Sequence, residues 1–168
     1  MSKKLTIALV ALVVVGAGAW YAFRPERLFI NQRVNEQFPT ALAANLEPMK
    51  LASGEFHAGA HETKGTAAIF KLADGKRTLR LTGFATSNGP DVHVYLVAAG
   101  DAKDNDTVKN AGFIDLGSLK GNIGDQNYDV PANLDLAKYR AATIWCARFN
   151  VNFGTAPLMS DSMQSMNR

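Results

Sequence analysis

Residues 67–82 read AAIFKLADGKRTLRLT, two short apolar runs separated by a polar break. We expect one strand at Ala67–Leu72 and another at Arg77–Thr82, because both runs have the length and the boundaries of a strand. Between them lies the pair Asp74-Gly75, which supplies positive φ at little cost and closes a hairpin. The stretch therefore predicts two antiparallel strands joined by a tight turn.

The same sequence pattern extends from Gly54 to Leu158, where short apolar runs are broken by Gly, Asp, Asn and Pro. This spacing is typical of a sandwich or barrel of short strands. The predicted fold class is all-β, a β-sandwich of short antiparallel strands preceded by one N-terminal transmembrane helix. Further strands are expected at Asp91–Val97, Gly112–Leu119, Gln126–Val130 and Ile144–Phe153, with a solvated loop at Gly100–Asn110.

The composition is that of a chain that can build a packed core: 168 residues, 47% apolar and 20% charged. Cys146 is the single cysteine, so an internal disulfide is impossible. The net charge of +3 lies outside the expected domain, because residues 54–158 contain 11 Lys and Arg against 11 Asp and Glu. A nucleic-acid binder carries its positive charge on the folded domain, so no nucleic-acid partner is expected.

Residues 5–23 form an uncharged apolar run of 19 residues. As a helix it would be about 28 Å long, close to the hydrocarbon thickness of a bilayer. Trp20 and Tyr21 lie at its end, where an interfacial aromatic belt belongs. The run predicts a transmembrane anchor. The rival interpretation is a cleaved signal peptide, with Ala17 and Ala19 in an A-x-A arrangement, and either one exports the domain.

The expected organisation of the chain follows from this anchor. The short N-terminus favours a single-pass protein of the cell membrane, with its C-terminal domain on the extracytoplasmic side. Residues 1–4 are then a cytoplasmic N-terminus, 5–23 the anchor, 24–50 a linker with a helical turn or two at 41–46, 51–158 the β domain and 159–168 a disordered tail.

Residues 143–153 contain the one group of side chains whose spacing suggests a chemical reaction. As a single extended strand, their odd positions form an apolar row that must face the core, with Trp145 and Phe149 in it. Cys146 would lie on the opposite, more polar face, beside Arg148 at about 6.6–7 Å along the strand. A guanidinium at that range favours thiolate over thiol, so Cys146 is a candidate redox thiol and Arg148 its candidate stabiliser. The alternative is a buried, inert cysteine, and a β-bulge would reverse the face.

Four segments also carry a family likeness: GEFH (54–57), GPDVHVYL (89–96), LGSLKGNIGDQNY (116–128) and IWCARF (144–149). In this order they resemble the DM-thirteen domain, also called the electron-transfer DM domain, of Skeletor-type animal proteins and bacterial membrane-anchored proteins. The resemblance covers about residues 51–158. It implies a compact β-sandwich-like domain and a role in extracytoplasmic redox or electron transfer, centred on the cysteine that Cys146 matches.

The three histidines are weaker candidates. His93 shares its strand face with Tyr95 and could meet Cys146 across the sheet, where a His–Cys pair would activate the thiol. The alternative is a hydrogen-bonded strand histidine. His57 and His61 are four residues apart without further ligands nearby, so surface histidines are favoured and no metal site is predicted. The sequence neither indicates nor excludes haem or copper, and the cofactor stays unknown.

Two functions stay open. The first is a membrane-anchored extracytoplasmic redox or electron-transfer module that uses Cys146 with a redox or envelope protein as partner. The second is a cell-envelope protein- or glycan-binding β-sandwich module without redox chemistry, which would use the loops at 100–110 and 117–126. A redox module is favoured over a stand-alone enzyme. The reactivity of the thiol separates the two functions.

Overall fold

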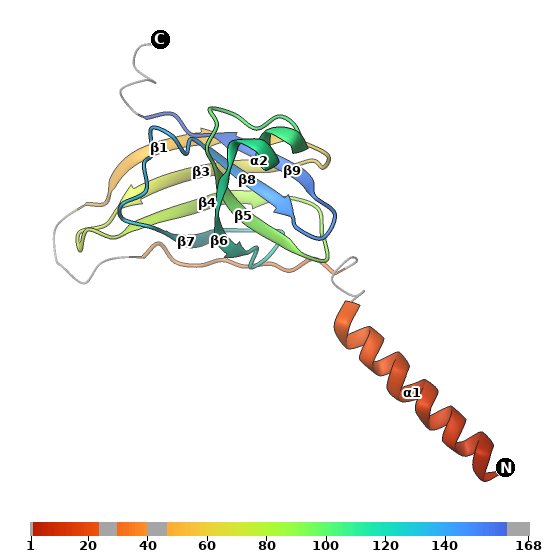
Figure 1. Ribbon diagram of the computed structural model, residues 1–168. Coiled ribbons are helices and arrows are strands. Elements are labelled where there is room, and N and C mark those ends of the chain that lie inside the picture. The colour runs from red at the N-terminus through yellow and green to blue at the C-terminus, as the bar shows by residue number, and fades with distance from the viewer. Residues whose placement is uncertain (1, 24–29, 40–46, 161–168) are drawn as a thin grey trace.

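The computed structural model describes residues 2–23, 30–39 and 47–160. Within these residues the chain forms two helices and nine strands (Figure 1). The expectations for residues 41–46 and for the tail from 161 onward lie outside the described residues. The elements are α1 (Lys3–Phe23), β1 (Met49–Glu55), β2 (His57–Ala58), β3 (Lys64–Lys71), β4 (Arg77–Ala85), β5 (Val92–Val97), α2 (Asn105–Ala111), β6 (Phe113–Ser118), β7 (Gln126–Val130), β8 (Ala141–Cys146) and β9 (Val151–Pro157).

The strands form two sheets that pack against each other (Figure 1). Four strands pair in the order β1-β3-β4-β7, and five pair in the order β2-β9-β8-β5-β6. All pairings between these strands are antiparallel. The predicted all-β sandwich is therefore confirmed, with β8 as the central strand of the five-stranded sheet.

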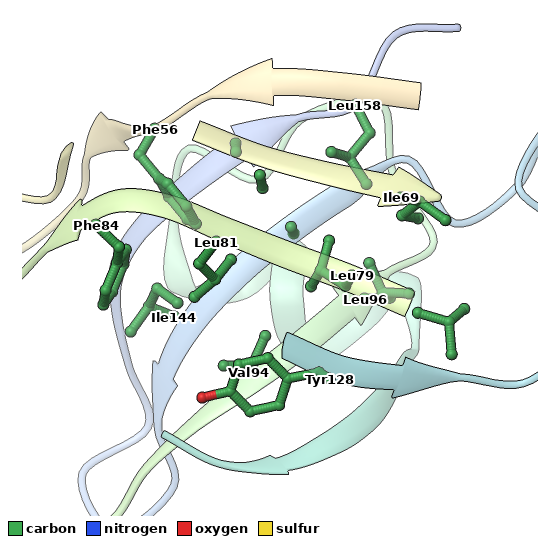
Figure 2. Close-up of a cluster of buried hydrophobic side chains, with 14 of the residues drawn as sticks. Phe56, Ile69, Leu79, Leu81, Phe84, Val94, Leu96, Tyr128, Ile144 and Leu158 are labelled. Carbon is green, nitrogen blue, oxygen red and sulfur yellow. The ribbon is translucent and has the colours of Figure 1, made fainter. Parts of the chain in front are cut away.

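Apolar side chains from both sheets fill the space between them (Figure 2). Burying one large aliphatic side chain contributes about 1.5–3 kcal/mol, so this cluster holds the two sheets together. Its fully buried members include Ile69, Leu79 and Leu81 from the four-stranded sheet and Val94, Leu96 and Ile144 from the five-stranded sheet.

The hairpin predicted around Asp74-Gly75 is confirmed. β3 and β4 pair antiparallel up to Lys71 and Arg77. Gly75 has a φ of 84°, and its N–H donates to the carbonyl of Leu72 at 2.9 Å. Glycine suits this left-handed conformation because it has no Cβ.

The single strand expected over residues 144–153 is wrong. β8 ends at Cys146, residues 147–150 form a turn, and β9 begins at Val151. Asn150 closes the turn with a φ of 54°, a left-handed conformation that Asn tolerates better than most residues. Odd–even alternation of side chains therefore does not run unbroken through this stretch.

The segment expected as a solvated loop, Gly100–Asn110, contains most of α2. The side chain of Asp104 caps the helix by accepting a hydrogen bond from the N–H of Thr107 at 2.7 Å. Ala102 and Val108 are fully buried against the outer face of the five-stranded sheet, where they join a second apolar cluster. The segment is therefore a cover for that face rather than a free loop.

Residues 30–39, which we name the strap, lie along the domain instead of forming a free linker (Figure 1). The N–H of Val34 donates to the carbonyl of Ile123 at 2.9 Å. The linker expected over residues 24–50 is therefore attached in part, and the first strand of the β domain already begins at Met49.

Glu36 fixes the strap beside β7. Its carboxylate accepts a hydrogen bond from Nζ of Lys120 at 2.8 Å and another from the backbone N–H of Asn127 at 2.8 Å. Burial raises the pKa of Glu36, but these bonds outweigh burial and hold the pKa below its ordinary value of 4.5. The strap is therefore held by the ionised carboxylate.

α1 stands apart from the sandwich (Figure 1), and none of its most apolar part, Lys3–Tyr21, is buried. Its mean hydropathy is 1.8. The helix is long and apolar enough to cross a membrane, and it is compatible with a membrane anchor or a signal sequence.

Replacing Glu36 by glutamine is expected to lower the free energy of unfolding by about 1 kcal/mol at neutral pH, since charge-assisted bonds to the strap are lost. The pKa of Glu36 is lower in the folded protein than in the unfolded chain. The carboxylate therefore stabilises the fold at pH values above 4.5, and this contribution is lost as the pH falls through the pKa of the folded state. Denaturant unfolding of wild type and E36Q at neutral and acid pH measures the effect. The exposed Glu47→Gln serves as control, and an E36Q deficit that persists unchanged in acid would contradict the assignment.

Candidate functional site

Cys146 is the last residue of β8, and its side chain points into the core between the two sheets. It is completely buried and belongs to the same apolar cluster as Ile144 and Phe153. Its partners in the sheet are Val92 of β5 and Val151 of β9. The expectation that the thiol lies on a polar face is therefore wrong.

The neighbours of Cys146 along the chain also differ from the extended-strand expectation. Trp145 packs on the outer face of the sheet, in the cluster that contains Tyr95. Phe149 is 64% exposed, and Arg148 is exposed in the same turn. Because the turn interrupts the strand, the spacing that would place the Arg148 guanidinium beside the sulfur is absent.

His93 lies on the opposite face of the sheet from Cys146, since its partner across β8 is Trp145. Both imidazole nitrogens contact carboxylates. Nδ1 lies 2.9 Å from Oδ2 of Asp115, and Nε2 lies 3.2 Å from Oδ1 of Asp91. The pairing of His93 with Cys146 considered from the sequence is therefore not formed, and His93 is a hydrogen-bonded strand histidine.

An aromatic group surrounds Tyr95 on this outer face. Its ring stacks on Phe113 with centroids 4.2 Å apart, and the ring of Trp145 lies 6.2 Å away. Burial and then the negative charges of Asp115 and Asp91 raise the pKa of Tyr95. The outer face thus presents neutral aromatic rings beside two carboxylates, without the thiol.

A crevice of about 80 Å³ opens at the end of the sandwich next to Cys146, and we name it the end crevice. Val92, the strand partner of Cys146, forms part of its wall. Gly89 lies close above the core, since a Cβ there would be 2.5 Å from Cγ2 of Val92 and 3.0 Å from Cζ of Phe153. A larger residue at position 89 would therefore collide with the side chains that cover the thiol end of the core.

The other two histidines have different partners. Nε2 of His57 lies 2.8 Å from Asp101, whereas the ring of His61 lies 3.9 Å from that of Phe153. Burial lowers the pKa of His57, but its bonds to Asp101 and to the Ala58 carbonyl raise it above the ordinary value. Within the described ranges, no group of three or more His, Cys, Asp or Glu side chains is placed to hold a metal ion.

Comparison with known families identifies the domain. The family model described as Electron transfer DM13 matches residues 55–158. The chain belongs to the DM13 family. A search of curated proteins and a search of solved structures found no match. The DM13 match confirms the likeness seen in the four sequence segments and gives electron transfer as the role that the family name describes.

Three of the four DM13 segments meet at the end crevice. Residues 89–96 and 116–128 contribute to its wall. Residues 144–149 pack beside it, because the N–H of Ala147 donates to the carbonyl of Asp91 at 2.8 Å. The fold therefore brings three of the four DM13 segments together at the end of the sandwich where β8 ends at Cys146.

Sequence reasoning missed the contribution of the strap to this site. Ile30 and Gln32 complete the wall of the end crevice, and the N–H of Gln32 donates to Oδ1 of Asn122 at 2.7 Å. Both residues lie outside the part of the chain that matches DM13. No motif or periodic pattern in the sequence marks them.

Replacing Cys146 by serine is expected to lower the free energy of unfolding by about 1–3 kcal/mol, because a hydroxyl would be buried in an apolar cluster. Cys146→Ala is expected to cost about 1 kcal/mol, since it leaves only a small void. Denaturant unfolding of both variants measures the difference. A serine variant as stable as wild type would contradict the burial of this side chain.

Proposed function

We propose that this protein is an extracytoplasmic electron-transfer module of the DM13 family, held at a membrane by α1, with Cys146 as its redox group. The observation that carries the proposal is the DM13 match over residues 55–158, which includes the single cysteine. The length and apolar character of α1 support the membrane location. The assignment of the thiol is supported by its place beside Val92, a residue of the end crevice where three of the DM13 segments meet.

Burial determines how such a thiol can react. Exchange with a disulfide requires direct contact between two sulfur atoms. Cys146 is 0% exposed, so contact requires that the sandwich opens at this end, through the turn 147–150 or the segment that carries Gly89. Turns open locally with free energies far below that of global unfolding. The proposed redox reaction is therefore gated by opening of this end.

A second candidate function is favoured by the same burial. A cysteine sealed among apolar side chains usually acts as an inert filler. The domain would then bind an envelope protein or a glycan through exposed loops or the end crevice, without redox chemistry. In that case Cys146→Ala would keep the function of the protein, since the side chain only fills space.

Thiol reactivity of the folded full-length protein separates these functions. A redox-active Cys146 is expected to be oxidised by hydrogen peroxide: the thiolate gives two electrons to the O–O bond, which breaks, and sulfenic acid and hydroxide form. Trapping with dimedone should label wild type but not Cys146→Ala. A bulky maleimide should react about a hundredfold more slowly than with the unfolded chain, because the sulfur must first be uncovered.

The control is the denatured wild-type chain, in which the thiol is open to both reagents. If peroxide modifies the denatured chain but leaves the folded protein untouched, the redox role of Cys146 is ruled out and the binding function is supported.

The proposed location is tested in sealed membrane vesicles of known orientation. The full chain is expected to resist carbonate extraction, and protease added on the extracytoplasmic side should digest the β domain. Changing Leu12 and Val14 to arginine should abolish retention, since each charge in the middle of a spanning helix costs roughly 2.5–3.5 kcal/mol. Recovery of a soluble chain that begins near Trp20 would instead show a cleaved signal.

A further inference from the structure

We propose that one end of the sandwich docks on the bilayer surface, with Phe149 as its principal inserting side chain. This inference rests on the membrane location proposed above. Among the described residues outside α1, Ile30 and Phe149 are the most exposed large apolar side chains, each 64% exposed. Phenylalanine is one of the side chains that interfacial segments bury at the boundary between headgroups and acyl chains.

Ile30 and Phe149 lie at the same end of the sandwich. Ile30 lines the end crevice together with Asp91. The carbonyl of Asp91 accepts a hydrogen bond from Ala147, the first residue of the turn that carries Phe149. Figure 1 shows the strap entering the domain at the end where β8 passes into β9. We name this end of the sandwich the tethered end.

The length of chain between α1 and the strap limits how far the tethered end can lie from the membrane. Only six residues, 24–29, separate Phe23 from Ile30. Even a fully extended chain would allow about 25 Å between these two residues. A short tether raises the local concentration of the two surfaces to the millimolar range, so a weak attraction is sufficient for docking.

Exposed basic side chains at the tethered end can contact a lipid surface. Basic side chains attract anionic headgroups, and an aromatic ring beside them can enter the interface. Arg148 is exposed next to Phe149. Arg33 and Lys64 are also exposed at this end, where the backbone of Arg33 pairs with that of Ile123. Acidic side chains, Glu62 and Asp91 among them, share this end, so the basic groups would attract headgroups one by one and not through an excess of positive charge.

Fluorescent labels at two engineered cysteines test the docking in the full chain. Ala60 lies at the tethered end, since its N–H donates to the carbonyl of Asn152, whereas Lys76 lies in the β3–β4 hairpin at the opposite end. The labelled chains are placed in phosphatidylcholine vesicles that contain phosphatidylserine and a headgroup-bound quencher. The label of Ala60→Cys should be quenched, and that of Lys76→Cys should not.

A point variant then tests the role of the ring. Phe149→Ser should lower the ratio of docked to undocked protein about tenfold, because the apolar surface that enters the interface is lost. Met49→Ser is the matched control, since Met49 is 59% exposed but lies beside Lys71 at the opposite end. This control should leave the quenching unchanged.

The labels are placed in a Cys146→Ala background and, in a second set, in chains that keep Cys146, whose burial slows its labelling.

Equal quenching at both positions, or quenching that survives Phe149→Ser, would overturn the docking. If the chain resists carbonate extraction but the label of Ala60→Cys is not quenched, the docking proposal is overturned and the membrane anchor is retained. Loss of the chain from the vesicles would overturn both the docking and the membrane anchor. A label that is shielded only after membrane proteins are added would show that the tethered end binds a protein partner instead.

Discussion

The structure depends on the burial of β8 on both of its faces. This strand lies in the middle of the five-stranded sheet, and all its residues, Ala141–Cys146, are buried. Ile144 and Cys146 face the other sheet, whereas Trp145 faces the cover formed by α2 and its flanking residues. A shift of one residue would exchange the two faces along the whole strand. The direction of the sulfur is therefore fixed by the packing of the sheet as a whole.

The outer cover is held by hydrogen bonds as well as by apolar contact. The carbonyl of Ala102 accepts bonds from Nδ2 of Asn152 at 2.7 Å and from Oγ1 of Thr155 at 2.9 Å. The hydroxyls of Thr143 and Thr155 lie 3.0 Å apart. Each such bond contributes about 1 kcal/mol, and leaving a buried group unpaired costs more. These bonds explain why the polar segment 100–110 packs against a sheet although its sequence resembles a solvated loop.

Sequence alone predicted the elements whose two faces differ or whose turns carry a strong signal. Asp74-Gly75 marked its hairpin, and β5 alternates as expected between core and outer face. Residues 143–153 gave no such information, because side chains buried on both faces read as one apolar run. Two signals did exist: the run exceeds the usual strand length of about 5–6 residues, and Asn150 suits a left-handed turn. The strap left no pattern, because the bonds that hold it, from its backbone and from the Glu36 carboxylate, join residues far apart in the sequence.

The place of Cys146 at the end of its strand connects the proposed chemistry to the proposed location. It is the last residue before the turn 147–150, so the sulfur lies at the edge of the core nearest the tethered end. A redox partner that reaches the thiol after this turn opens would have to approach from the side on which the proposed membrane surface lies. Insertion of Phe149 into the interface would hold the same turn closed. The bilayer and the redox partner would then compete for the same few residues, and release from the lipid surface would be the step that uncovers the sulfur.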